Sequence, residues 1–232
     1  MATEPEQLSV SVIVPVFNGE AFLREAIQSI QSQDWGKAEI IVVDDGSTDR
    51  TADIATGFGD RVRYVQQPNL GAAAARNRGI KMATGNVIAF LDADDLWLEH
   101  TLSLQLQKLQ ADPSLQMVRG HTQRTHRVAV QSGESRWENV GEAWPALSLG
   151  SAIMRKPVFD SVGYLDESLV FNEDVDWFLR AKETGIVTLL HEDVVQLYRR
   201  HEHNLTNNRE QNKTSFLRTL KNTIERKRNN GE

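Results

Sequence analysis

Three carboxylates, Asp92, Asp94 and Asp95, directly follow the apolar run Val87–Leu91. The run predicts a short buried strand, and ionised carboxylates are rarely buried unpaired, so this strand is expected to end at a solvent-facing edge. If the strand continues, Asp92 and Asp94 point to the same face. A hard cation such as Mg²⁺ or Mn²⁺ would relieve their repulsion and bridge to a phosphate-bearing substrate. The spacing alone is equally consistent with an acidic turn that caps the next helix.

The segments that position these carboxylates alternate between strand and helix patterns. Strands are predicted at residues 10–17, 39–43, 61–66 and 87–91, and helices at 22–30, 48–58 and 72–83. This alternation predicts an α/β fold in one domain, with a mainly parallel, Rossmann-like sheet flanked by helices. Ligands of such sheets bind at the carboxyl ends of strands. Asp44 and Asp45 follow the second strand there, as Asp92 and Asp94 follow the fourth, which favours a site over surface charge.

The second half of the chain has weaker patterns. We expect helices at 97–111, 157–162 and 173–184, and strands at 117–118, 151–155, 186–190 and 194–198, with His191-Glu192-Asp193 as an acidic turn. Residues 121–144 are polar and are expected to form a loop or irregular strands. Trp137 and Trp144 within them would either form a wall for a sugar or acceptor or cover the core locally.

Composition narrows the class of protein. The 232 residues are 40% hydrophobic and 25% charged, which is ordinary for a globular protein, and the net charge of −6 argues against a nucleic-acid binder. The absence of cysteine excludes disulfides, thiolate metal sites and a cysteine nucleophile. The polar N-terminus, expected to be flexible over residues 1–8, has no signal-peptide pattern, and no apolar run approaches the ~18 residues of a membrane span. A cytoplasmic location is therefore expected.

The C-terminal segment 207–232 is predicted to be a basic helix or tail. Phe216, Leu217, Leu220 and Ile224 lie near one helical face. This face would either pack on the domain, fray in solvent, or contact the inner face of the membrane peripherally.

Taken together, the motifs resemble those of family 2 glycosyltransferases of the GT-A fold. The likeness covers about residues 9–206 and rests on Ser11-Val-Ile-Val-Pro-Val-Phe-Asn18, Val43-Asp-Asp-Gly-Ser-Thr-Asp49, Gly71 with Ala75-Arg-Asn77, Leu91-Asp-Ala-Asp-Asp95, Gly163-Tyr-Leu-Asp-Glu167, and Glu173-Asp174 with Arg180. Each motif is weak by itself, but six in this order are specific. The resemblance implies a nucleotide-binding half at 9–119 and an acceptor and catalytic half at 120–206. It also implies transfer of a sugar from a nucleotide diphosphate donor to an acceptor hydroxyl.

The resemblance also implies roles on the nucleotide side. Asp45 would accept a hydrogen bond from a nucleobase N–H, and Asp44 would either hold the turn or touch the nucleotide. Arg76 would approach the nucleotide or form an ion pair on the helix surface. The base pocket would be lined by Pro15, Val16 and Phe17.

On the diphosphate side, Asp94 matches the metal-binding end of the family's DxD motif. Asp92 would hold the ribose, a metal-bound water or the metal, and Asp95 would ligate the metal or cap the following helix. His201 would ligate Mn²⁺ or contact phosphate, and Arg199 or Arg200 would pair with phosphate. A flexible lid would include His203, Asn204 and Thr206.

On the acceptor side, Asp174 matches the family's general base, with Glu173 as the substitute candidate. A helix N-terminus favours the carboxylate anion and so lowers its basicity unless burial compensates. Helix capping is the alternative role for this pair. Inversion at the anomeric carbon is implied by the resemblance alone.

Two other functions fit parts of the sequence. One is a nucleotide-sugar-binding protein without catalysis, and the other is a sugar nucleotidyltransferase, for which the chain lacks a Gly-rich, basic N-terminal loop. No dinucleotide-binding or P-loop pattern occurs. UDP is the expected carrier, with dTDP and GDP as alternatives, and the acceptor would be a glycan, a lipid-linked molecule or a protein. Such an enzyme would serve polysaccharide or cell-envelope glycan synthesis.

Overall fold

The computed structural model describes residues 7–129, 135–202, 204 and 207–229. Most of the predicted flexible N-terminus (residues 1–6) lies outside this range. His203 and Thr206 of the predicted lid also lie outside the described residues.

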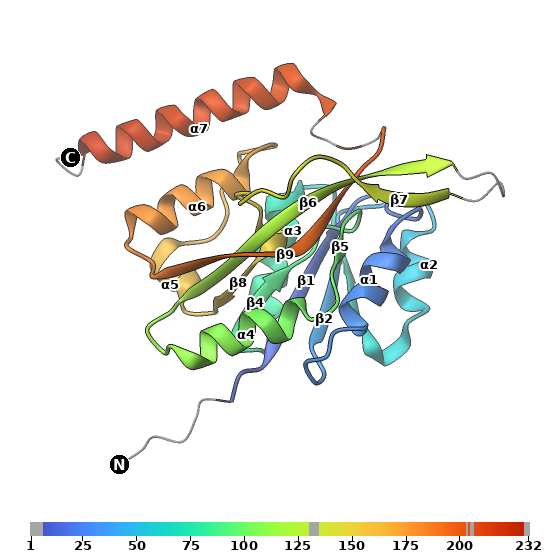
Figure 1. Cartoon of the computed structure of the whole chain (residues 1–232). Coiled ribbons are helices and arrows are strands. Elements are labelled where there is room, and N and C mark those ends of the chain that lie inside the picture. The colour runs from blue at the N-terminus through green and yellow to red at the C-terminus, as the bar shows by residue number, and fades with distance from the viewer. Residues whose placement is uncertain (1–6, 130–134, 203, 205–206, 230–232) are drawn as a thin grey trace, which may run out of the picture.

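The described strands form one mixed sheet in the order β3-β2-β1-β4-β8-β6-β9-β5, with β7 paired to β6 (Figure 1). The strands are β1 (Val10–Val16), β2 (Glu39–Asp44), β3 (Arg63–Gln66), β4 (Val87–Phe90), β5 (Leu96–Trp97), β6 (Met117–Ala129), β7 (Ser135–Asn139), β8 (Ala152–Arg155) and β9 (Thr188–Arg200). The helices are α1 (Leu23–Gln31), α2 (Thr51–Thr56), α3 (Ala72–Met82), α4 (Thr101–Ala111), α5 (Val158–Val162), α6 (Glu173–Glu183) and α7 (Arg209–Asn229), with short 3-10 turns at Gly59–Arg61 and Leu149–Ser151.

The N-terminal half of the sheet is the parallel layer that the sequence predicts. β1 pairs in parallel with β2 and β4, and β2 pairs in parallel with β3. All seven residues of β1 are buried, as expected for a strand covered on both faces. The second half is mixed, because β8 is antiparallel to both β4 and β6, whereas β6 and β9 are parallel to each other.

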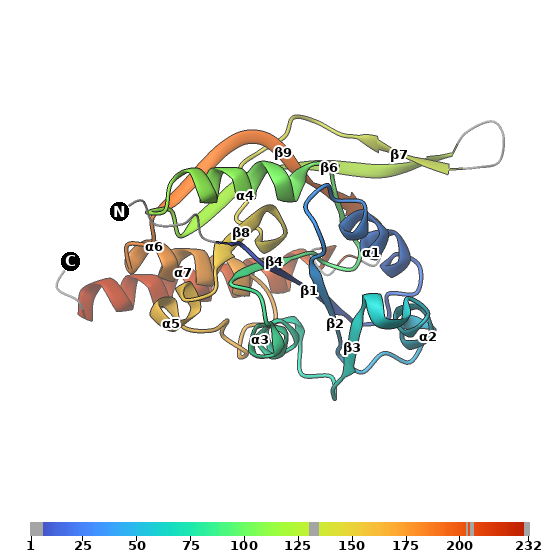
Figure 2. The same cartoon turned by 90° about the horizontal axis from the view of Figure 1, so that it is seen from below.

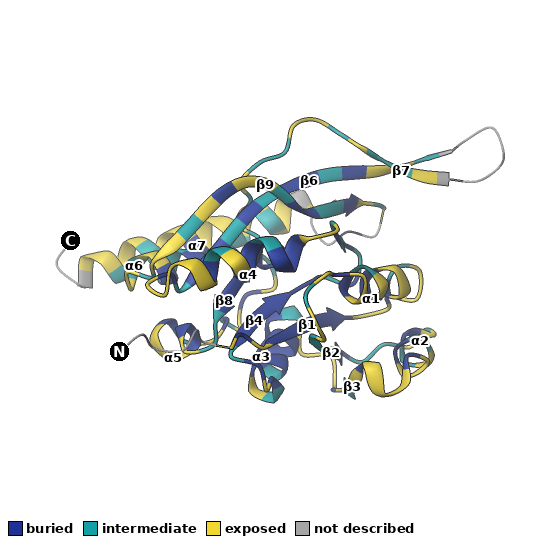
Figure 3. Cartoon of the chain, turned by 60° about the horizontal axis from the view of Figure 1, so that its bottom comes forward, coloured by how far each residue is buried: buried dark blue, intermediate teal, exposed yellow. Residues whose placement is uncertain are grey.

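Helices cover both faces of this sheet (Figure 2). On one face, α1, α2 and α4 pack against the strands through residues such as Ile27, Ala55 and Leu106. On the other, α3, α5 and α6 do so through residues such as Phe159 and Trp177. The strands β1, β2 and β4 are consequently buried while the outer helix surfaces are exposed (Figure 3). The doubly wound α/β prediction is confirmed.

One glycine allows α3 to lie close to the sheet. A Cβ built on Gly79 would come within 2.3 Å of Cγ2 of Ile13 in β1. Any larger residue would push α3 outward. Because α3 also carries Arg76 and Asn77, this close packing sets the depth at which two motif side chains enter the structure.

The prediction of a loop or irregular strands at 121–144 is wrong for much of that segment. β6 extends to Ala129, and β7 follows it as a hairpin partner. The predicted acidic turn at 191–193 is also wrong, because β9 runs unbroken from Thr188 to Arg200. The parallel β6–β9 pairing satisfies the backbone groups of both polar strands, and only a register irregularity near His121 interrupts it. The polar composition of these two segments gives no local indication that they pair as strands.

Helix starts also differ from expectation. α4 begins at Thr101 rather than residue 97, because Leu96 and Trp97 pair with β9 as β5. The Asn18 backbone N–H donates to Ser47 Oγ at 2.8 Å, which ties together the loops after β1 and β2.

Within the described residues, no helix has the length and apolar character needed to cross a membrane.

Candidate active site

The turn after β4 divides its three carboxylates between the interior and the surface. The Asp95 carboxylate is buried and accepts hydrogen bonds from Gln196 Nε2 at 2.6 Å and from the Arg199 backbone N–H at 3.0 Å. Burial, reinforced by the charges of Asp94 and Asp92, raises the pKa of Asp95 well above its usual range. Asp92 and Asp94 remain 37% and 33% exposed. Asp95 therefore anchors the turn, and the other two carboxylates face outward.

Asp94 meets His201 and Asn204, which lie just beyond β9. Its Oδ2 atom is 3.1 Å from Nε2 of His201 and accepts a hydrogen bond from Nδ2 of Asn204 at 3.1 Å. The His201 ring stacks on Phe22, with ring centroids 4.3 Å apart. The sequence placed Asp94 and His201 in one site, and the structure brings them together.

The Arg199 side chain holds the backbone of the turn after β4 from the interior of the domain. Its side chain is fully buried and contacts the Asp94 carbonyl oxygen and the Glu25 carboxylate. The guanidinium lies 5.0 Å from the ring centroid of Phe22 and 5.5 Å from that of Trp137. Arg199 is therefore committed to the protein rather than to a phosphate, and Trp137 covers this cation.

Arg200 is exposed and alternates with Arg199 along β9, so the two side chains leave opposite faces of the strand. Its neighbour across the β6–β9 pairing is His126. The structure does not bring Arg200 to the carboxylate cluster, although the sequence analysis placed it with the donor phosphates.

A second ion-pair centre joins the turn after β4 to the start of α6. Arg76 donates from Nη2 to Asp92 Oδ1 and from Nη1 to Glu173 Oε1, both at 2.5 Å. Burial alone would lower the pKa of Arg76, but the carboxylates of Asp92, Glu173 and Asp174 raise it. Its Nε atom is buried without a hydrogen-bond partner in the described structure. Arg76 is thus the cation around which three acidic side chains gather.

Asp174 lies beside this centre in the first turn of α6. Burial, followed by the negative charge of Glu173, raises the pKa of Asp174 to about 7, although the positive charge of Arg76 opposes the shift. A helix N-terminus is expected to lower the basicity of this carboxyl unless burial compensates, and here burial together with the charge of Glu173 raises its pKa. A carboxyl with this pKa can accept a proton near neutral pH.

On the nucleotide side, the two aspartates after β2 have different surroundings. Asp44 is fully buried, with Oδ1 accepting from the Ser47 N–H and Oδ2 accepting from the Tyr64 hydroxyl at 2.6 Å. Burial and this hydrogen bond raise the pKa of Tyr64. Both oxygens of Asp44 are thus used to hold the turn, which is one of the two roles that the sequence left open.

Asp45 points instead toward the loop before α3. Its Oδ1 accepts from Gln67 Nε2 and the Leu70 N–H, and Oδ2 accepts from the Gly71 N–H at 2.8 Å. Gly71 has φ +95°, a conformation that favours glycine. The three donors fix the Asp45 carboxylate at the edge of β2.

The three residues predicted to line the base pocket lie at the end of β1. Pro15 and Val16 are buried, and the Val16 carbonyl accepts from the Asp45 N–H at 2.8 Å. Phe17 is 52% exposed and presents its ring beside this edge. Of the three, Phe17 alone offers a large apolar surface.

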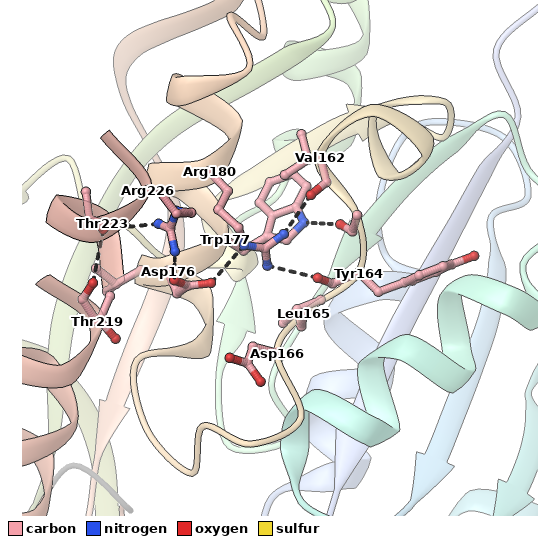
Figure 4. A network of polar contacts seen from close by, with 12 residues as sticks. Val162, Tyr164, Leu165, Asp166, Asp176, Trp177, Arg180, Thr219, Thr223 and Arg226 are labelled. Carbon is pink, nitrogen blue, oxygen red and sulfur yellow. Dashed lines mark hydrogen bonds and ion pairs between the residues drawn. The ribbon is translucent and has the colours of Figure 1, made fainter. Parts of the chain in front are cut away.

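The Ala75-Arg-Asn77 and Gly163–Glu167 motifs meet across α3. Asn77 Oδ1 accepts from the Leu165 N–H, while its Nδ2 donates to the Leu165 carbonyl and to Glu167. Arg180 of α6 holds the same loop by donating to the carbonyl oxygens of Val162 and Tyr164 (Figure 4). These motif residues therefore hold the loop that follows α5.

No group of three or more His, Asp or Glu side chains forms a metal-binding cluster among the described residues. Asp94 and His201 nevertheless fit a divalent cation, because a partly exposed carboxylate oxygen and an imidazole nitrogen lie 3.1 Å apart. Two protein ligands would suffice if diphosphate oxygens completed the coordination.

A model of the family "Glycosyl transferase family 2" matches residues 11–162. The chain belongs to this family. An uncharacterised glycosyltransferase of Rickettsia typhi is 31% identical over 201 residues, which are 81% of this chain and 63% of that protein. The glycosyltransferase GlyA of Streptococcus pneumoniae is 42% identical over 110 residues, 44% of this chain and 16% of that protein. The family 2 chain therefore spans less than two thirds of these relatives.

Solved structures of the same fold agree with this family 2 assignment. S. aureus TarS 1–349 in complex with UDP-GlcNAc has a TM-score of 0.73 at 23% identity, covering 87% of this chain and 61% of that one. The mannosyltransferase PcManGT of Pyrobaculum calidifontis, in complex with GDP-Man and Mn²⁺, has a TM-score of 0.73 at 20% identity, covering 95% of this chain and 65% of that one. The GT-A fold expected from the sequence is confirmed.

Sequence reasoning missed several supporting residues. Glu25, Phe22 and Gln196 hold Arg199, His201 and Asp95, respectively, yet none of them stands near an acidic motif in the sequence. Glu25 lies on the exposed face of α1, and nothing in the neighbouring sequence indicates its contact with Arg199. Only the fold brings these residues to the turn after β4.

Proposed function

We propose that the protein is an inverting, metal-assisted glycosyltransferase that moves a sugar from a nucleotide diphosphate donor, with UDP as the carrier, to an acceptor hydroxyl. The observation that carries the proposal is the double ion pair of Arg76. It links Asp92, on the donor side, to Glu173, next to Asp174. Residues 9–119 would bind the donor, and residues 120–206 would bind the acceptor.

In this proposal the nucleobase lies between Phe17 and the loop that Asp45 holds. Asp45 Oδ2 accepts a hydrogen bond from the Gly71 N–H, and its second lone pair would accept another from a nucleobase N–H. Asp92 would hold the ribose through the oxygen that Arg76 does not contact. Asp44 would act indirectly, by keeping the turn after β2 in place.

Asp94 and His201 would hold a divalent cation at the diphosphate. The cation, when bound, supplies Lewis-acid neutralisation of charge on the leaving diphosphate. Arg199 keeps the Asp94 carbonyl in place, and Asn204 orients the Asp94 carboxylate. The cation would be shared by the Asp94 carboxylate and by Nε2 of His201, which lies 3.1 Å from Asp94 Oδ2.

Asp174 would remove the proton from the attacking acceptor hydroxyl. Its raised pKa near 7 suits a base that works at neutral pH. Glu173 is engaged by Arg76 and therefore contributes charge rather than proton transfer. Attack on the side of the sugar opposite the diphosphate inverts the anomeric carbon.

A cleft of about 400 Å³ beside the start of α6 offers a place for the acceptor. It is lined by Ser168, Leu169, Val170 and Phe171 and by the first turns of α7. The loop 168–171 leads directly into Glu173 and Asp174, so an acceptor in this cleft would lie on the side of the proposed base.

The direct test is incubation of the purified chain with UDP-, dTDP- and GDP-sugars plus Mn²⁺, with and without simple glycan acceptors. The panel includes UDP-GlcNAc and GDP-mannose, which are bound in structures of the same fold. Release of a nucleoside diphosphate with inverted sugar supports the proposal. Pyrophosphate release from a nucleoside triphosphate and sugar phosphate would instead indicate a nucleotidyltransferase. Donor binding without any turnover would indicate a binding protein.

A further inference from the structure

The C-terminal helix α7 packs on the domain with its polar side. Thr219 is fully buried, and Arg226 pairs with Asp176 of α6 (Figure 4). Arg226 also pairs with Glu183 of α6. Near its start, Ser215 donates to the Phe171 carbonyl and Asn212 accepts from Asn172. Hydrogen bonds and ion pairs therefore join the polar side of α7 to the domain, while the hydroxyl of the buried Thr219 has no hydrogen-bond partner among the described residues.

The apolar side of α7 faces away from the domain. Phe216, Leu217, Leu220 and Ile224 are 41%, 57%, 38% and 52% exposed. At 100° per residue, these four positions fall within one stripe about 100° wide. A helix of a water-soluble domain normally buries such a stripe, so the orientation of α7 is the reverse of the usual one.

Positive charge accompanies this apolar stripe. Of the 26 basic and 32 acidic residues in the chain, seven basic and two acidic ones lie in α7. The helix thus carries a formal charge of +5 and the rest of the chain −11. Helical spacing places Lys213 and Lys227 within the stripe, and Lys221 and Arg228 along one border of it. All four are exposed.

We propose that α7 docks this protein on an anionic lipid surface. An exposed apolar stripe flanked by lysine and arginine is the pattern of an interfacial helix, which inserts apolar side chains while its cations bind acidic headgroups. Pairing of this stripe with that of a second copy would bring two helices of charge +5 together, which electrostatic repulsion disfavours. The formal charge of −11 on the rest of the chain repels such a surface and keeps the other faces of the domain away from it.

Docking through α7 has a consequence for the site. The hydrogen bonds from Ser215 and Asn172 tie the first turns of α7 to the loop that precedes Glu173 and Asp174. The cleft at residues 168–171 shares its wall with these turns. A membrane-bound α7 therefore holds this cleft close to the bilayer, within reach of an acceptor carried on a lipid.

The test is flotation of the full chain with vesicles of pure phosphatidylcholine and vesicles that also contain phosphatidylglycerol. We expect binding to the phosphatidylglycerol vesicles that is at least tenfold stronger than to neutral ones and that weakens at high salt. The double variant Leu217→Glu/Ile224→Glu is expected to lose at least tenfold of this binding. Replacing both Lys213 and Lys227 with Gln is expected to abolish the preference for anionic lipid.

The matched control is Val187→Glu/Leu190→Glu, which adds the same charge at two apolar residues of equal exposure (46% each) outside α7. This control is expected to bind vesicles with a modest loss only, and the thermal midpoint of each variant checks that it folds. Equal binding by the α7 variant and the control would overturn the proposal, as would no binding to either kind of vesicle. A concentration-dependent dimer that Leu217→Glu/Ile224→Glu abolishes would assign the stripe to a second copy. Because Mn²⁺-dependent UDP binding is measured separately, failure here is distinguishable from failure of the proposed transferase activity.

Discussion

Nη1 of Arg76 lies 2.5 Å from Oε1 of Glu173, although 97 residues separate the two along the chain. The same guanidinium contacts Asp92 through its other terminal nitrogen. Arg76 therefore couples the turn after β4 to the start of α6, and its charge offsets three carboxylates in a largely buried space. Several properties of the site depend on this one cation.

Arg76→Met is expected to leave Asp92, Glu173 and Asp174 without their cation. Removing one partner from a buried ion pair typically costs about 3–5 kcal/mol, so the free energy of unfolding should fall by that order. Urea unfolding followed by circular dichroism measures it. Arg78→Met on the same helix is the control, since Arg78 donates an exposed hydrogen bond to the Gln66 carbonyl and forms no ion pair among the described residues. Equal effects of the two substitutions would contradict the role given to Arg76.

The pH dependence of the transfer rate should report Asp174. A general base works only when it is deprotonated, and the pKa of Asp174 is raised to about 7. We therefore expect kcat/KM to fall as the pH drops below about 7 and to level off above it. The measurement is the initial rate of nucleotide release across pH 4.5–9. An acid limb near pH 4, the range of an ordinary carboxyl, would contradict the assignment.

Much of the parallel half of the fold follows from the sequence because its signals are local. Apolar runs such as residues 39–43 and 87–91 predict strands buried on both faces, and the acidic residues that follow these runs mark the carboxyl ends of the strands. These local signals predict Asp44, Asp45, Asp92 and Asp94 at the carboxyl ends of strands, whereas Asp174 is assigned to the site only through the resemblance to the family. Strand pairing in parallel then brings the acidic turns to one edge.

The remainder depends on contacts between distant segments. β6 and β9 consist largely of polar side chains, and pairing with each other and with β5, β7 and β8 holds them in the sheet. Arg199 stands next to Arg200 in the sequence, and the two are chemically alike, yet one is fully buried and the other exposed. Which arginine enters the interior depends on the strand register, and register is set by pairing rather than by local composition.

Arg199→Lys is expected to disturb the turn that carries Asp94. Lysine keeps the charge but loses the planar fork and the stacking between Phe22 and Trp137. Buried acceptors left unpaired typically cost about 1–3 kcal/mol, and we expect a loss of stability in that range. Arg200→Lys is the stability control, with an expected change within about 0.5 kcal/mol, as is usual for surface positions. A destabilisation by Arg200→Lys as large as that by Arg199→Lys would refute the role of Arg199.

Asp94→Ala is expected to remove the dependence of nucleotide binding on Mn²⁺. Asp94 and His201 are the proposed protein ligands, and without the carboxylate the cation loses its one anionic ligand from the protein. Calorimetric titration of UDP with Mn²⁺, and with EDTA in its place, measures this dependence. Wild type should bind UDP more tightly with Mn²⁺, whereas the variant should bind equally in both conditions. A variant that keeps the full Mn²⁺ effect would remove Asp94 from the proposed metal site.

The most direct test of the account is the rate at which Asp174→Asn turns over a nucleotide sugar that it still binds. Asparagine nearly preserves the shape of the side chain but cannot accept the acceptor proton, and loss of a general base typically slows a reaction by about 10²–10⁴-fold. If Asp174 is the general base, kcat falls by that factor with unchanged donor affinity, while the surface control Asp160→Asn matches wild type. A turnover rate for Asp174→Asn equal to that of wild type would show that Asp174 is not the base.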